Sequence, residues 1–229
     1  MKIKTVKTAF IKTIPVMAGY LFLGGGFGIL MENAGYGILM SFIMSVIIYA
    51  GTGQYLGVSL LVGTASFLTT AITTFMVNAR HIFYSVSMVE KYKDTKPYKP
   101  YLVFGLTDET YSLLCDIKIA DNIDKNLFYF CVTFFNHCYW IMGCTLGNVI
   151  SRFLPFSTTG IDFSMTALFV ATFTEQWITN KNHLPAIVGV FCSLICLFIF
   201  GKENFLIPSM IIITFILFFI KPNMEVGNA

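Results

Sequence analysis

Two clusters of polar and ionisable side chains lie inside stretches of this chain that are otherwise apolar. Their members are Asn78, Arg80 and His81 in the first cluster, and Thr107, Asp108 and Glu109 in the second. An ionisable group at bilayer depth costs roughly 2.5–3.5 kcal/mol on insertion scales, so such groups are usually retained for a function. A cationic cluster and an anionic cluster on neighbouring apolar segments predict a site for a molecule that carries both charges.

Each cluster also has a simpler interpretation. Arg80 can present its planar guanidinium to a carboxylate, a geometry that lysine does not match, or it can reach the headgroups and anchor a helix end. Asp108 and Glu109 are adjacent, so one is expected to face the interior and the other a partner or water. They can serve as a counter-charge for an ammonium group or as proton-binding carboxylates, or they can be solvated charges of a surface segment.

A third polar feature lies earlier in the chain, where Gly51 and Gly53 flank Thr52 and Gln54 follows. Glycine lowers helix propensity and permits backbone shapes closed to other residues. The pattern predicts a broken helix, in which Gln54 and unwound backbone meet a substrate. The alternative is a glycine-mediated helix contact with Gln54 as an interhelical hydrogen-bonding residue.

The composition identifies the environment of these residues. The chain has 229 residues, of which 56% are hydrophobic and 12% are charged, and its mean hydropathy is +0.74. A soluble domain of this length needs more charged surface, so the sequence predicts an all-α, polytopic membrane protein. The six cysteines have neither disulfide-framework nor zinc-motif spacing, so no cofactor or metal is expected.

The apolar segments provide the candidate spans. They cover 13–31, 38–62, 64–88, 102–115, 127–150, 163–179, 184–200 and 205–220. A crossing helix needs about 20 residues, so 102–115 is too short for an ordinary span. The basic N-terminal segment, without a cleavage site, is expected to be a retained first helix with its basic end in the cytoplasm.

The lysine-rich loop 89–101 decides between two topologies. By the positive-inside rule this loop is cytoplasmic, which requires one crossing rather than two between it and the first helix. We therefore favour six full crossings with two broken or re-entrant segments, 38–62 and 102–115, over seven or eight full spans. Both termini are then cytoplasmic, in a bacterial plasma membrane, and residues 1–229 form a single transmembrane transporter domain.

Three of these motifs, taken in order, resemble the AzlC family, the large subunit of bacterial branched-chain amino acid exporters. The matching pieces are Ala50-Gly51-Thr52-Gly53-Gln54-Tyr55, Asn78-Ala79-Arg80-His81 with Tyr84, and Phe104-Gly105-Leu106-Thr107-Asp108-Glu109-Thr110, with a weaker match at Gly160-Ile161-Asp162-Phe163. Their order and separation agree with the family over essentially the whole chain. This sequence departs from the family at four positions, which change the hydroxyl groups of the presumed pathway and bear on specificity. They are Thr52, Tyr55, Ala79 and Tyr111, where members often have Ser, Phe, Leu and Phe, respectively.

The resemblance implies secondary-active export of hydrophobic amino acids, typically leucine, isoleucine and valine, with a small membrane subunit of the AzlD type as partner. On this hypothesis Arg80 holds the substrate carboxylate, and Asp108 or Glu109 faces the ammonium group or accepts a coupling proton. Gly51, Gly53 and Gln54 supply backbone and amide contacts. The alternatives are a channel or pore-forming subunit for small ions or solutes, and a structural partner subunit. An intramembrane enzyme is not expected, because adjacent carboxylates do not form a convergent acid–base pair.

Overall fold

The computed structural model describes residues 2–63, 66–78, 80–115, 117, 119–120, 122–153, 163, 166–167, 170, 173–174, 177–178 and 182–225. These residues form helices and connecting turns, and no strand occurs among them, which agrees with the predicted all-α class. The chain divides into two compact units, Met1–Met165 and Thr166–Ala229, which are described separately. That residues 1–229 act as a single transporter domain stays a prediction.

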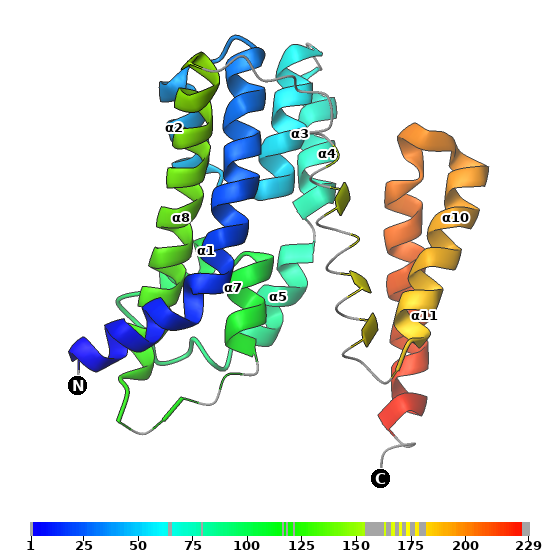
Figure 1. Ribbon diagram of the computed structural model, residues 1–229. Helices are drawn as coiled ribbons and strands as arrows, with labels where there is room; N and C mark the ends of the chain where they lie inside the picture. Colours follow the sequence, from blue (N-terminus) through cyan, green and yellow to red (C-terminus); the bar gives the residue numbers. More distant parts are fainter. Residues whose placement is uncertain are drawn as a thin grey trace. The chain divides into compact units, whose positions relative to one another are not determined.

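The first unit is built on two long helices, α1 (Lys2–Asn33) and α8 (Lys125–Phe153), which pack along one another (Figure 1). Both are long and apolar enough to cross a membrane. Figure 1 shows α1 bending in its N-terminal part, and Pro15 lies inside this helix. A proline inside a helix removes one backbone hydrogen bond and crowds the preceding turn, so a bend is expected there.

Glycines on facing turns allow α1 and α8 to approach closely. Gly24 and Gly28 of α1 meet Gly143 and Gly147 of α8, and a Cβ added at Gly143 would lie 2.6 Å from the Tyr20 carbonyl oxygen. A Cβ at Gly28 or Gly147 would overlap backbone atoms of the other helix. Small residues four positions apart on both partners give this geometry in membrane helices, where backbone contact replaces hydrophobic packing.

Hairpin A, defined here as residues 38–62, consists of α2 (Ile38–Ile47) and α3 (Gly51–Val62). The chain reverses between them at Tyr49, whose φ of 43° lies in the left-handed region that costs about 1–2 kcal/mol for a non-glycine residue. The Met44 methyl group then lies next to Gly57, as expected for antiparallel arms. The break therefore precedes the glycines, and Gly51 and Gly53 lie within α3.

Neighbouring contacts show where hairpin A enters the unit. Gly37, just before α2, lies beside the guanidinium of Arg152 at the C-terminal end of α8. The Tyr49 ring, at the tip, is centred 4.2 Å from that of His137, near the middle of α8. α3 then returns in the opposite direction and lies against α1. Its Tyr55 donates a hydrogen bond to the carbonyl oxygen of Leu23 at 2.6 Å.

Hairpin B, defined here as residues 99–115, enters from the other end. It consists of α6 (Lys99–Phe104) and α7 (Asp108–Cys115), joined by a turn at 105–107. At its base, the ammonium group of Lys91 binds the carbonyl oxygens of Leu114 and Cys115, the last residues of α7. At its tip, a Cβ at Gly105 would overlap the Thr133 methyl group of α8. Within the described ranges of the first unit, segments 38–62 and 102–115, singled out by charge and length, therefore both fold back.

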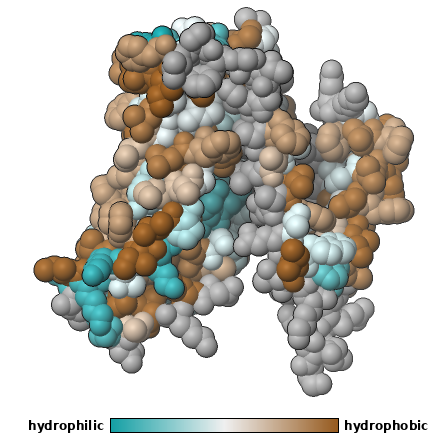
Figure 2. All heavy atoms as spheres, viewed as in Figure 1, coloured by the Kyte–Doolittle hydropathy of each residue, from teal (hydrophilic) through white to brown (hydrophobic). Residues whose placement is uncertain are grey.

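Helices α4 (Phe67–Asn78) and α5 (Arg80–Met88) follow one another with only residue 79 between them, and α5 packs against α7. The lysine-rich loop 89–98 after α5 lies at the same end as the N-terminus. Asn126 at the start of α8 donates to the Asp94 carbonyl oxygen, and the Asp124 amide donates to the Thr5 hydroxyl of α1. Figure 2 shows hydrophilic side chains at this end, with others at the opposite end and in the middle of the visible face, among many apolar ones.

The second unit contains α10 (Leu184–Asn204) and α11 (Leu206–Glu225), which pack side by side (Figure 1). The segment Leu184–Gly201 is long and apolar enough to cross a membrane. Gly201 interrupts the end of α10 with a φ of 72°, a conformation that glycine adopts without steric cost. The predicted span 163–179 is described only in part.

Candidate functional site

The tips of the two hairpins meet beside the middle of α8, within aromatic walls. The ring of Tyr49, from hairpin A, is centred 6.2 Å from that of Phe104, from hairpin B. Tyr101 of hairpin B has its hydroxyl 2.9 Å from Nδ1 of His137, the imidazole against which Tyr49 packs. Two interrupted helical segments therefore end at the same place, where an apolar side chain would find aromatic surfaces.

Gln54, in the first turn of α3, is fully buried beside Trp140 of α8. The indole Nε1–H donates to Gln54 Oε1 at 2.7 Å. Because an indole nitrogen is only a donor, this bond fixes which way the amide points. Gln54 Nε2 is buried and has no hydrogen-bond partner within the described part of the chain. Gly51 permits this approach, because a Cβ there would lie 3.3 Å from the Trp140 ring.

Asn78, the last residue of α4, lies against hairpin A. A Cβ at Gly53 would be 3.1 Å from Asn78 Nδ2, so the glycine leaves room for the amide. The amide nitrogen donates to the Thr74 carbonyl oxygen at 2.9 Å. Its Oδ1 is buried without a hydrogen-bond partner among the residues that the structure describes. The predicted residues Gly53 and Asn78 are therefore neighbours in the structure, and Gln54 follows Gly53 in α3.

Glu109 belongs to a chain of hydrogen bonds that runs through the tip of hairpin B. The Tyr20 hydroxyl of α1 lies 2.6 Å from Glu109 Oε2 and 2.7 Å from Thr107 Oγ1. Thr107 Oγ1 is 3.1 Å from Thr110 Oγ1, which accepts a hydrogen bond from Asn136 Nδ2 at 3.0 Å. Asn136 is fully buried, and its Oδ1 has no hydrogen-bond partner in the ranges described.

Asp108 points elsewhere, as expected for adjacent residues on a helix. Its Oδ1 lies 3.8 Å from Nε2 of His81 on α5, and both side chains are partly exposed. The same face of α5 and α7 carries stacked rings of Tyr84 and Tyr111, with centroids 4.7 Å apart. The structure thus separates the two acids, with Glu109 bound to α1 and Asp108 facing α5.

Three parts of the sequence prediction fall outside what the structure describes. Arg80 is the first residue of α5, but its side chain is not among the atoms that the structure describes. Ala79 and the stretch 160–162 of the weaker fourth motif also lie outside the described residues. The role given to Arg80 stays a prediction, as does the absence of a cofactor.

The structure adds residues that sequence patterns did not single out. Tyr20 and Trp140 are buried in the middle of apolar helices and look like ordinary core aromatics in the sequence. Their rings pack edge to face, with centroids 5.3 Å apart, and each polar atom bonds a predicted site residue. Asn136 offered a weak signal, because an amide within an apolar segment needs a hydrogen-bond partner.

Three buried amide atoms of these residues have no hydrogen-bond partner among the described residues, and they differ in polarity. Gln54 Nε2 is a donor, whereas Asn136 Oδ1 and Asn78 Oδ1 are acceptors. A buried polar atom without a hydrogen bond costs about 1–3 kcal/mol, so such atoms require an explanation. The carboxylate of a bound molecule could accept a hydrogen bond from a donor such as Gln54 Nε2. Its ammonium group could donate to an acceptor such as Asn136 Oδ1 or Asn78 Oδ1.

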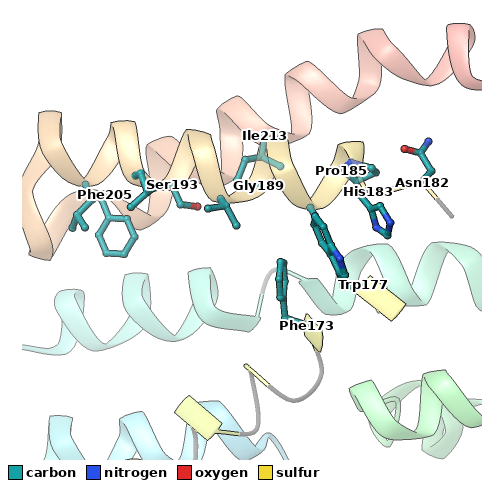
Figure 3. Close-up of a pocket in the computed structure, with 13 residues that line it drawn as sticks. Phe173, Trp177, Asn182, His183, Pro185, Gly189, Ser193, Phe205 and Ile213 are labelled. Atoms are coloured by element: carbon teal, nitrogen blue, oxygen red, sulfur yellow. The ribbon is translucent and has the colours of Figure 1, made fainter. Parts of the chain in front are cut away.

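The second unit has a separate cavity of about 800 Å³ beside α10 (Figure 3). Trp177 and His183 stack at one end of it, with ring centroids 4.2 Å apart. Most of its other lining residues are apolar, among them Phe173, Val190 and Ile213. Asn182, His183 and Ser193 supply its polar groups, and none of the predicted site residues lines it, so we place the candidate site in the first unit.

The fold and this site define a helical membrane protein with a polar centre formed by two helical hairpins. Residues 15–154 match the family model described as AzlC protein, and the chain belongs to this family. It is 40% identical to the branched-chain amino acid transport protein AzlC of Bacillus subtilis over 219 residues, which cover 96% of this chain and 86% of that protein.

Other relatives are membrane proteins by name. An uncharacterized membrane protein of Haemophilus influenzae is 40% identical over 93% of this chain and 88% of its own length. The inner membrane protein YgaZ of Escherichia coli is 24% identical over 69% of this chain and 68% of its own length. No solved structure matches the chain significantly.

Proposed function

We propose that this chain is a secondary-active exporter of branched-chain or other hydrophobic amino acids. The observation that carries the proposal is the pair of unsatisfied, fully buried amides, Gln54 and Asn136, at the meeting point of two hairpins. It is supported by the name of the Bacillus subtilis relative, a branched-chain amino acid transport protein. A chain of this family is accordingly a transport protein rather than an enzyme.

The two charged ends of an amino acid find different partners in this site. Gln54 Nε2 donates to the carboxylate, together with Arg80, whose guanidinium suits a planar anion. Asn136 Oδ1 accepts from the ammonium group, and Glu109 belongs to the same hydrogen-bonded network. The aromatic rings of Tyr49 and Phe104 contact the apolar side chain.

The arrangement also supports a membrane topology. Hairpins A and B enter the first unit from opposite ends, while α1, α8 and the pair α4–α5 run along its length. Broken helices whose ends meet near the midplane are a common way for transporters to bind substrates. We propose that the basic end faces the cytoplasm, because it carries the lysines of the N-terminus and of loop 89–98.

Export direction, proton coupling and a small membrane subunit of the AzlD type belong to this proposal. Counterflow of labelled leucine in proteoliposomes, with and without a pH gradient, tests it. An exporter gives saturable exchange that a pH gradient drives uphill. Flux that does not saturate would identify a channel or pore-forming subunit instead, and absence of leucine flux with the purified partner present would refute the proposal.

Arg80→Lys provides the sharpest variant for the carboxylate role. Lysine keeps the positive charge but loses the bidentate fork, so we expect leucine exchange to be abolished while the protein still inserts in the membrane. Lys93→Arg, in the exposed loop, is the matched control and should leave exchange unchanged. Normal exchange by Arg80→Lys would remove Arg80 from the substrate site.

A further inference from the structure

His137, near the middle of α8, contacts the tips of both hairpins with its imidazole. The Tyr49 ring of hairpin A is centred 4.2 Å away, with 32° between the ring planes. From hairpin B, the Tyr101 hydroxyl lies 2.9 Å from Nδ1, and the Phe104 ring packs edge to face against the imidazole, with centroids 5.9 Å apart. His137 is 7% exposed. An ionisable side chain buried in a membrane helix is usually retained for a function, and the proposed substrate contacts do not use this one.

The C-terminal end of α2, in hairpin A, also lies at this imidazole. The backbone of Ser45 and Val46 interacts with the ring, and the helix ends at Ile47. The last carbonyl groups of a helix have no partner within it and carry its partial negative charge. Because Tyr101 bonds Nδ1, Nε2 is the nitrogen available to these carbonyl oxygens, and it has no other hydrogen-bond partner among the described residues. Carbonyl oxygens only accept, so they favour a hydrogen on Nε2.

The surroundings of Nδ1 suit both the neutral and the protonated imidazole. When the hydrogen is on Nε2, Nδ1 accepts a hydrogen bond from the Tyr101 hydroxyl. A proton added to the lone pair of Nδ1 makes this nitrogen a donor, and the hydroxyl oxygen accepts after its hydrogen has turned about the C–O bond. The N–H bond is the only covalent bond that forms, and none breaks. Nδ1 can therefore take up and release a proton while it keeps its contact with hairpin B.

The groups around the imidazole also favour its positive charge. The carbonyl end of α2 carries a partial negative charge, as at the C-terminus of any helix. The Tyr49 ring lies within the distance at which an aromatic face attracts a cation. Both groups belong to hairpin A, so a proton on the imidazole strengthens the attraction between α8 and this hairpin.

We propose that His137 carries the coupling proton of this exporter, and that its charge controls how firmly α8 holds the tips of both hairpins. This inference rests on the proposed function. It assigns the proton to α8 rather than to Asp108 or Glu109, the acids that the sequence singled out. Proton binding strengthens the contacts of one ring with Tyr49 and with Tyr101, and proton release weakens them. A group at which both tips end can thus bias their movement.

Other titratable side chains near this imidazole come from both hairpins, from α8 and from α1. Tyr49 and Tyr101 contact the ring directly. One contact further away lie Glu109 and Tyr20, which interact with Tyr49, and Cys138, which interacts with Tyr101. Phenol and thiol groups are ordinarily neutral at pH 7, whereas carboxyl and imidazole groups titrate below it. A variant that removes the imidazole and leaves the acid intact therefore distinguishes the two.

Proteoliposomes that contain the chain and its partner subunit provide two measurements. Counterflow of labelled leucine without a pH gradient reports exchange, and accumulation of leucine against its own gradient under an imposed pH gradient reports proton coupling. His137→Gln keeps a polar side chain that does not bind a proton, so we expect counterflow to persist and accumulation to be lost. His183→Gln makes the same change in the second unit, where the ring stacks on Trp177, and should keep both.

Tyr101→Phe covers the case in which His137→Gln fails to fold. It keeps the imidazole and the ring of hairpin B but removes the hydroxyl that faces Nδ1. A hydrogen bond to a charged group contributes more than one to a neutral group, so the loss falls mainly on the protonated form. The pH at which accumulation is half-maximal should therefore fall by about one unit. Tyr55→Phe, whose hydroxyl donates to the Leu23 carbonyl oxygen, is the matched control and should leave this pH unchanged.

Accumulation by folded His137→Gln, or loss of its counterflow together with accumulation, would overturn the assignment of the coupling proton to His137. Counterflow without pH-driven accumulation in the unmodified protein would overturn it as well, because no proton would then be coupled. Absence of leucine counterflow in the unmodified protein would instead overturn the proposed function.

Discussion

Replacing Gln54 by glutamate tests the carboxylate site with almost no change of shape. Glutamate retains an oxygen that accepts from Trp140 Nε1, the bond that holds this side chain at 2.7 Å. It replaces the unpaired Nε2 donor with a second acceptor. The fold should therefore persist, while the group proposed to hold the substrate carboxylate is lost.

The magnitude follows from the type of bond removed. A hydrogen bond to a charged group contributes about 1.5–3 kcal/mol. Since 1.4 kcal/mol corresponds to a factor of ten in an equilibrium constant, the half-saturation for leucine should rise about 10- to 100-fold. An ionised glutamate would also repel the substrate carboxylate and weaken binding further. The 10- to 100-fold rise in half-saturation is therefore a lower range.

Leucine counterflow over a range of concentrations measures this change, with elution as a single species in detergent as the check on folding. Asn126→Asp is the matched control, because it makes the same chemical change at the start of α8, where the amide donates to the Asp94 carbonyl oxygen outside the site. Unchanged half-saturation in Gln54→Glu would refute the assignment of this amide to the substrate.

Two further predictions concern how the site is held in place. Gly147→Ala should lower the free energy of unfolding in detergent by about 1–3 kcal/mol, because its Cβ overlaps the backbone of α1, whereas Gly19→Ala, with open space around the added Cβ, should be close to neutral. Equal effects of the two changes would contradict close packing of α1 on α8. Lys91→Met should destabilise by about 1–2 kcal/mol, because its ammonium group binds the final carbonyl oxygens of α7, and exposed Lys93→Met should not. Thermal unfolding of both lysine variants decides this, and matching midpoints would show that Lys91 does not hold hairpin B.

The sequence alone indicated the hairpins because local composition and charge are sufficient for that inference. Segment 102–115 is too short to cross a bilayer, and the lysines of loop 89–98 share the basic end with the N-terminus. The position of the first break was less accurate. Glycine propensity pointed to 51–53, whereas the reversal occurs at Tyr49, where packing against His137 and Phe104 outweighs backbone preference.

The order of the motifs determined the family, since Gln54, Asn78 with Arg80, and Thr107 to Glu109 are each visible in the sequence. Only the tertiary structure decided which side chains share hydrogen bonds. Tyr20 and Glu109 are 89 positions apart, and Gln54 and Trp140 are 86 apart, so no local pattern links them. Their pairing depends on how two hairpins pack beside the glycine contact of α1 and α8, a long-range arrangement that buries their polar atoms together.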